Sequence, residues 1–193
     1  LGSGSLGTAI TTGTDNVAIG EAALDAVTTG STNTAVGDNA GGAITTGSQN
    51  VAVGSASGLA LTTGDQNVIV GEQAGEGLTT ASAVTLVGCE AGGGATITGD
   101  HNVGVGRKAL FDLTTGASNV AVGRSALENV TTADNNTAVG KDALKTNTTG
   151  GTNTAVGTSA LLDNTTGAHN TAVGDDALAN NTTADGNTSI GRN

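Results

Sequence analysis

The chain repeats one 17-residue unit eleven times, and this period constrains its fold more than any other feature. The clearest copy is RSALENVTTADNNTAVG at residues 124–140. Divided after each terminal Gly, the units are 4–20, 21–37, 38–54, 55–71, 72–88, 89–106, 107–123, 124–140, 141–157, 158–174 and 175–191, and only 89–106 is one residue longer. A fixed period of this length is typical of a stacked array. We interpret residues 1–193 as a single repeat array and expect it to be an excerpt of a longer fibre, because neither end has a polar capping repeat.

Composition limits what such an array can do. The chain carries 17 Asp and Glu against six Lys and Arg, for a formal charge of −11. It has one Phe and no Trp, Tyr, Met or Pro, so its core must be built from smaller side chains and must be narrow. Nucleic-acid binding requires a basic surface, and no apolar run reaches transmembrane length. We therefore expect no nucleic-acid partner and no membrane insertion by this segment.

Each unit is expected to contain two short β-segments joined by turns. The first is Asn-x-Ala-Val-Gly, as in residues 153–157, whose small and β-branched residues favour a strand. The Gly that ends it permits a backbone conformation that other residues disfavour. The Thr-Thr pair later in the unit is a second strand signal, and the Gly, Asp, Ser or Asn after it indicates a turn. The turn glycines are Gly20, Gly37, Gly54, Gly71, Gly88, Gly106, Gly123, Gly140, Gly157, Gly174 and Gly191.

This order of elements predicts an all-β fold, a parallel β-solenoid or β-roll of eleven coils. Coils stack about 4.8 Å apart, so the rod would be roughly 50 Å long. Each residue then lies above its equivalent, and one Asn per unit forms a ladder whose carboxamides bond from coil to coil. The ladder comprises Asn16, Asn33, Asn50, Asn67, Asn102, Asn119, Asn136, Asn153, Asn170 and Asn187, and Val84 interrupts it. Stacked helices are disfavoured, because Gly, Thr, Asn and Val are poor helix formers.

Two positions in the arm after the strand vary together. Where the first is Gly, the residue three positions later is large, as in Gly41 and Ile44; where it is Leu in the last units, the later residue is Asn, as in Leu144 and Asn147. We interpret both positions as facing one packed space. Neighbouring strand residues point to opposite faces, so some apolar side chains must lie outside. Exposed apolar surface usually marks a partner, and a parallel homotrimer would cover it.

Several segments resemble a known family. Residues 16–20 (NVAIG) and 119–123 (NVAVG) are similar to the head repeats of trimeric autotransporter adhesins of the YadA type. The longer unit at residues 153–167 also resembles repeats in phage tail-fibre and related bacterial surface proteins. The resemblance covers almost the whole chain and implies a left-handed parallel β-roll with three chains packed around an axis. The repeat length differs, since the adhesin heads use a shorter unit.

A stripe of cations is the one candidate ligand site. The residue after the terminal Gly is Arg107, Arg124 and Lys141 in three consecutive units. Like charges stacked at strand spacing repel each other, so this grouping could bind an anionic glycan. The alternative is neutralisation by acidic neighbours, namely Glu128, Asp112 and Asp142.

Catalytic and metal sites are not indicated. His101 and His169 occupy the same unit position four coils apart, about 19 Å at the usual spacing, and cannot form a dyad. Cys89 has no His near it in the repeat frame. Turn carboxylates at Asp100, Asp134 and Asp185 could bind Ca²⁺, but residues 92–100 do not fit the Gly-rich calcium pattern and ordinary solvated turns explain them. We expect no enzyme activity, no metal and no cofactor.

Two further patterns leave alternatives open. Regular Thr columns can bind ice, but this normally needs two outward Thr separated by one residue, whereas Thr148 and Thr149 are adjacent. Asn-x-Thr triplets match glycosylation sequons, although chance explains them in a chain so rich in Asn and Thr. They include Asn129, Asn147, Asn164 and Asn181.

These features predict a structural protein outside the cell, at a cell or virion surface. We expect a rigid adhesin shaft or phage tail fibre that associates with itself and presents multivalent contacts to a host-surface glycan or protein receptor. One alternative is a filament formed by end-to-end stacking of solenoids, since open edges template further pairing. An ice-binding solenoid is the other.

Overall fold

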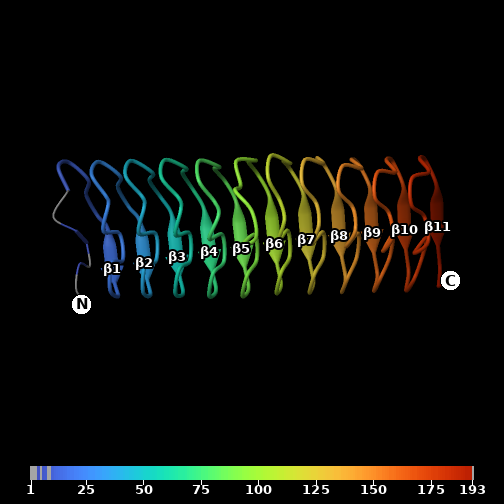
Figure 1. Cartoon of the computed structure of the whole chain (residues 1–193), viewed down its shortest axis with the longest axis horizontal. Helices are drawn as coiled ribbons and strands as arrows, with labels where there is room; N and C mark the ends of the chain where they lie inside the picture. Colours follow the sequence, from blue (N-terminus) through green and yellow to red (C-terminus); the bar gives the residue numbers. More distant parts are fainter. Residues whose placement is uncertain (1–3, 5, 8–9, 193) are drawn as a thin grey trace.

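The computed structural model describes residues 4, 6–7 and 10–192, which wind as a stack of coils along one axis (Figure 1). Eleven strands, one per repeat, form one parallel sheet in sequence order within these residues, and none of them forms a helix. The strands are β1 (Val17–Ile19), β2 (Thr34–Val36), β3 (Val51–Val53), β4 (Val68–Val70), β5 (Thr85–Val87), β6 (Val103–Val105), β7 (Val120–Val122), β8 (Thr137–Val139), β9 (Thr154–Val156), β10 (Thr171–Val173) and β11 (Thr188–Ile190). The expectation of an all-β parallel β-solenoid is confirmed.

The strands pair in register, each residue beside its equivalent in the next coil. Ala121 lies opposite Ala138, for example. The register survives the longer unit 89–106 because its additional residue is accommodated in the arm. In this arm the Gly94 amide donates to the carbonyl of Phe111, 17 residues further along the chain. The Thr98 amide donates to the carbonyl of Thr114, which is only 16 residues further along, so the offset between the coils changes by one residue between Gly94 and Thr98. The strand column is therefore continuous across the irregular coil.

The middle residue of each strand faces the interior, and its two neighbours face outward. Ala121 and Ala138 are fully buried, while Val122 and Val139 are each 37% exposed. Strand side chains alternate between faces, so the Ala and the Val beside it cannot both enter the core. The strand Val residues therefore lie outside, and the interior is built mainly of Ala, Leu, Ile and Asn.

The predicted second strand at Thr-Thr is wrong. Outside the eleven strands, the described residues contain only one isolated bridge. In the coil of residues 38–54, the amides of Thr45, Thr46 and Gly47 all donate to the carbonyl of Thr62, at 2.9, 3.4 and 3.3 Å. A parallel ladder uses evenly spaced bonds along an extended strand, whereas three donors converging on one acceptor bend the chain into a turn. Each coil therefore has one strand, followed by an arm and a turn.

The arm after each strand depends on positive φ angles. The terminal glycines have φ between 126° and 141°, and a Cβ added to Gly123 would collide with the carbonyl of Gly140 in the next coil. Four residues after these glycines, Leu127 and Leu144 adopt φ of 50° and are buried. The left-handed conformation costs a non-Gly residue about 1–2 kcal/mol, and burying a Leu contributes about 1.5–3 kcal/mol. Burial therefore outweighs the backbone strain.

The cross-section of the interior changes along the axis with the residues at one strand position and two arm positions, and three of its forms recur or stand out. They are typified by Leu110, Leu113 and Ala121 in coil 107–123, by Gly75, Leu78 and Leu86 in coil 72–88, and by Leu144, Asn147 and Ala155 in coil 141–157. A Cβ on Gly41 would lie 2.9 Å from Cδ1 of Ile44. The two arm positions thus share one packed space, as their covariation predicts.

We predict that Gly104→Ala destabilises the chain. The added Cβ would lie 2.9 Å from Cδ2 of Leu86 and 3.2 Å from Cδ1 of Leu110, and overpacking of this kind costs about 1–3 kcal/mol. The double variant Leu86→Ala/Gly104→Ala recreates the pairing seen between Ala121 and Ala138, and should be more stable than Leu86→Ala alone, which leaves a cavity. Urea denaturation of the four chains measures the coupling; strictly additive effects would contradict the contact.

Candidate functional site

A ladder of asparagines, most of them buried, runs along the inside of the solenoid from coil to coil. Asn119 donates from Nδ2 to Oδ1 of Asn102 at 3.1 Å and to the carbonyl of Ala133 at 2.8 Å. Its own Oδ1 accepts from the amide and Nδ2 of Asn136, at 3.0 and 3.2 Å. One carboxamide therefore connects the start of its strand to the preceding coil through Asn102, and to the next coil through the turn carbonyl of Ala133 and the amide of Asn136. The amide-to-Oδ1 bond recurs at each step from Asn16 to Asn187 except one.

The exception is the step after Val84, where the sequence predicts an interruption. The Val84 amide still donates to Oδ1 of Asn67 at 2.9 Å, but its side chain offers no acceptor to the amide of Asn102. The carboxamide of Asn102 bonds to the carbonyls of Gly99 and Gly116 instead, at 2.9 and 2.8 Å. The irregular coil therefore loses one axial bond and gains a buried Val side chain.

A second, shorter ladder was missed by the sequence analysis. Nδ2 of Asn164 donates to Oδ1 of Asn147 at 3.0 Å, and Nδ2 of Asn181 donates to Oδ1 of Asn164 at 2.9 Å. The signal was the consecutive Asn-Thr-Thr segments of the last three units, which we interpreted only as packing partners and sequons. Asn147 and Asn164 are 0% exposed, so neither can carry a glycan in the folded chain.

The first ladder generates a pair of opposite predictions. Asn119→Ala leaves the Asn136 amide and the Ala133 carbonyl without their partner in a buried site, and should lower the free energy of unfolding by about 2–4 kcal/mol. Val84→Asn restores an acceptor for the Asn102 amide and should raise it by about 1 kcal/mol. Calorimetric melting of both variants against the parent chain checks the signs. A destabilising Val84→Asn would mean that the irregular coil has no room for the carboxamide.

The cation stripe is already paired with carboxylates. Arg107, Arg124 and Lys141 have side chains 55% exposed. Nη2 of Arg107 lies 3.3 Å from Glu90, while Arg124 and Lys141 both approach Asp142, at 3.8 and 3.2 Å. The arrangement favours neutralisation over a free anion-binding stripe, because each cation has an acidic partner close by.

The partners differ in part from those proposed from sequence. Asp142 is one of them, but Glu128 pairs with Lys145 at 3.5 Å. Asp112 stacks beside Glu128, and its amide donates to the Glu128 carbonyl at 2.9 Å. Burial raises the pKa of the Asp112 carboxyl, the negative charge of Glu128 raises it further, and Lys108 lowers it.

This raised pKa gives a pH-dependent prediction. A carboxyl whose folded pKa lies above its unfolded value favours the fold while it is protonated, and that contribution is lost as pH rises through the folded pKa. Asp112→Asn should therefore raise the melting temperature near pH 7 and have less effect at about pH 3. Asp163→Asn, at the same unit position and exposed, is the matched control. Equal shifts in both variants at both pH values would contradict the expected behaviour.

The turn aspartates have a structural role. Oδ1 of Asp134 accepts the Ala117 amide and Oδ1 of Asp185 accepts the Ala168 amide, both at 2.7 Å. Asp100 likewise accepts from Ser82 in the preceding coil, at 2.8 Å. Within the described part of the chain, no three His, Cys, Asp or Glu side chains group closely enough to hold a metal ion. Each of these carboxylates thus caps a turn in the preceding coil.

The histidines and the cysteine lie on the outside of the coils. His101 and His169 are exposed turn residues with φ of 61° and 59°. Their strands, β6 and β10, are four coils apart in the sheet. Cys89 is a partly exposed free thiol at the start of its coil.

The outward face of the sheet is uncharged and partly apolar. Its two columns, the first and third residues of every strand, contain only Val, Ile and Thr. Val17 and Ile19 are 48% and 50% exposed at one end, and Val122 and Val139 are 37% exposed further along. The sequence predicted an apolar surplus outside, and the structure places it on this sheet.

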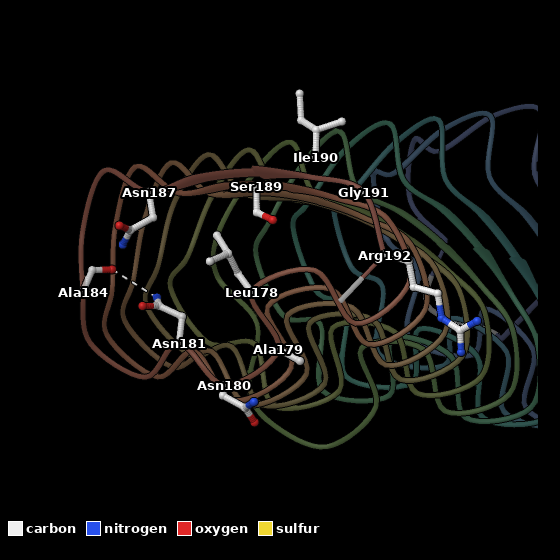
Figure 2. A pocket seen from close by; sticks show the side chains of 10 residues that line it. All are labelled: Leu178, Ala179, Asn180, Asn181, Ala184, Asn187, Ser189, Ile190, Gly191 and Arg192. Atoms are coloured by element: carbon white, nitrogen blue, oxygen red, sulfur yellow. Dashed lines mark hydrogen bonds between the residues drawn. The ribbon is translucent and has the colours of Figure 1, made fainter.

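A hollow lies at the axial end of the last coil. Figure 2 shows Leu178, Asn187 and Ser189 lining it, with side chains directed into the coil interior. The equivalent positions one coil earlier include Leu161 and Asn170, which are buried. The hollow is therefore the core of the solenoid seen in cross-section at its last coil.

No protein-family model, curated protein or solved structure matches the chain. None of the described segments is a helix long and apolar enough to cross a bilayer. The likeness to adhesin heads and tail fibres therefore depends on the repeat segments themselves, and the family remains a hypothesis.

Proposed function

We propose that this chain forms the rigid shaft of an extracellular fibre, in a surface adhesin or a phage tail fibre, and assembles as a parallel homotrimer. The observation that supports the proposal is the outward sheet face, which carries only Val, Ile and Thr over eleven strands. Apolar side chains that stay partly or fully exposed along one face favour burial against a partner. Because the face is as periodic as the chain, another copy of the same chain matches its repeat.

The size of the face favours three chains over two. Eleven strands about 4.8 Å apart, each of three residues of about 3.3 Å, give a face of roughly 50 by 10 Å, or about 500 Å². A stable pairwise interface buries about 800 Å² on each partner. A face-to-face dimer would use only this footprint, whereas a chain in a threefold arrangement would contact two neighbours and would also use the flanks of its sheet.

The proposed mechanism is mechanical and multivalent. Backbone and asparagine bonds run parallel to the axis, so bending the rod requires many bonds to deform together. Identical columns repeat on every coil, and weak contacts to a host-surface glycan or protein receptor would add up through effective concentration. The paired state of Arg107, Arg124 and Lys141 supports a receptor contact spread over many coils rather than one concentrated on this stripe.

We predict a native mass three times the 18.2 kDa of the chain, measured by light scattering after size exclusion. Val139→Glu places a charge on the sheet face and should lower the mass while leaving the circular dichroism spectrum unchanged. Thr149→Glu, an exposed turn position of the next coil, is the control and should leave the mass unchanged. Ala138→Glu is unsuitable as a probe, because Ala138 is fully buried and the charge would unfold the coil.

Ice binding is a second candidate, favoured by the outward side chains of the strand. The Thr-Thr columns are not suited to it, because Oγ1 of Thr148 bonds to the carbonyl of Thr165 at 3.1 Å and only Thr149 is exposed. The strand instead presents two columns separated by one residue, such as Thr154 and Val156, at regular spacings of about 4.8 and 6.6 Å.

The native mass, measured together with thermal hysteresis and sedimentation, separates the candidate functions. If the chain is a monomer that shows thermal hysteresis, and Val139→Glu abolishes the hysteresis, the chain is an ice-binding solenoid and the shaft proposal is wrong. Material that pellets at high speed would indicate a filament formed by axial stacking. A monomer with neither property would contradict the homotrimer directly.

A further inference from the structure

The coils of residues 55–123 fit their neighbours more specifically than the other coils do. Among the regular coils, between residues 124 and 174, successive coils present the same inward strand residue and the same arm residue, as in Ala138 with Leu144 and Ala155 with Leu161. Such coils are nearly interchangeable. Looping out one coil would bring equivalent surfaces together, and the entropy of closing a loop rises only slowly with its length.

In coils 55–71 and 72–88 the inward strand residues are large. Ile69 and Leu86 replace the usual Ala and are fully buried. Space for them comes from glycines in the arms, both in the same coil and in the next one. A Cβ on Gly58 would lie 2.9 Å from Cδ1 of Ile69, and one on Gly75 would lie 3.1 Å from Leu86 and 3.2 Å from Ile69.

Coil 89–106 provides the complementary small surface. Its inward strand residue is Gly104 and its arm residue is Gly92. A Cβ on Gly92 would lie 2.8 Å from Cδ1 of Leu86, and one on Gly104 would lie 2.9 Å from Cδ2 of the same Leu86. The Leu86 side chain therefore projects into space that only this coil leaves open.

The next coil, 107–123, cannot take that place. Its residues at the two positions are Leu110 and Ala121, and both carry a Cβ, which at these positions would lie 2.8 and 2.9 Å from the Leu86 methyls and would force that side chain to move. Leu110 would also bring a complete side chain into the position of Gly92. Two successive large surfaces, at Ile69 and Leu86, thus meet one small surface at Gly104, and coil 107–123 does not offer the same fit.

We infer that residues 55–123 form a register block, a conformational device that fixes the stacking order of an otherwise interchangeable array. Coil 89–106 cannot be skipped, whereas coils in the regular part tolerate skipping. The device protects against looped-out coils and against exchange of coils between chains, which are characteristic errors of repeat proteins. The inference concerns the fold alone and stands whether or not the shaft proposal is correct.

Whole-coil deletions test it, because each deletion creates the neighbour pair that a skipped coil would create. Removing residues 141–157 joins Gly140 to Thr158 and leaves the repeat pattern intact, so we expect cooperative melting within a few degrees of the parent chain. Removing residues 89–106 joins Gly88 to Arg107 and forces Leu86 against Leu110 and Ala121. We expect a large drop in melting temperature or loss of the cooperative transition.

Leu86→Ala supplies the decisive comparison, since its effect should change sign. In the intact chain it leaves a cavity and lowers the melting temperature. In the chain lacking 89–106 it removes the clash and should raise the melting temperature or restore the transition. Equal tolerance of the two deletions would overturn the inference. It would also be overturned if Leu86→Ala lowered stability in both backgrounds, or if the chain lacking 89–106 stayed unfolded with Leu86→Ala.

Discussion

Axial hydrogen bonding between equivalent residues is the constraint on which the rest of this structure depends. A coil of 17 residues encloses few side chains, and its turns bring backbone carbonyls such as that of Ala133 close to the interior. Buried polar groups must be paired. The Asn carboxamide meets this need because it donates to the turn carbonyl of the next coil while accepting from the ladder residue of that coil. The same amide-to-Oδ1 bond repeats at every step except the one after Val84, so one residue type at one unit position serves almost the whole rod.

The thinness of the coil also explains its unusual residue choices. Leucines such as Leu127 accept a left-handed backbone conformation because the arm must turn sharply and no larger part of the core is available to bury them. Glycines at the same position avoid the strain, but a bulky residue elsewhere in the coil must then fill the space. The abundance of Gly is therefore a consequence of close approach between coils and does not indicate a flexible chain.

The charges are arranged so that one face stays free of them. Five of the six cations lie within residues 107–145, where carboxylates pair with them, and no Lys or Arg occurs before residue 107. The remaining surface is acidic, which disfavours indiscriminate lateral association. The outward sheet face carries no charge in either column of its strands. Self-association, if directed by these surfaces, is directed to that face.

The sequence by itself determined the period, the coil, the in-register stacking and the asparagine ladder with its break at Val84, because each follows from a unit repeated at constant length. The covariation of Gly41 with Ile44 likewise revealed a shared packed space. The sequence did not distinguish a second strand from a turn at Thr-Thr, because the difference lies in three amides converging on one carbonyl of the next coil. Only the tertiary structure decided that Ala121 faces inward and Val122 outward, and that Asn147 and Asn164 form a ladder. It also decided which carboxylate neutralises each cation. These outcomes depend on the direction of side chains between adjacent coils, which a one-dimensional repeat does not specify.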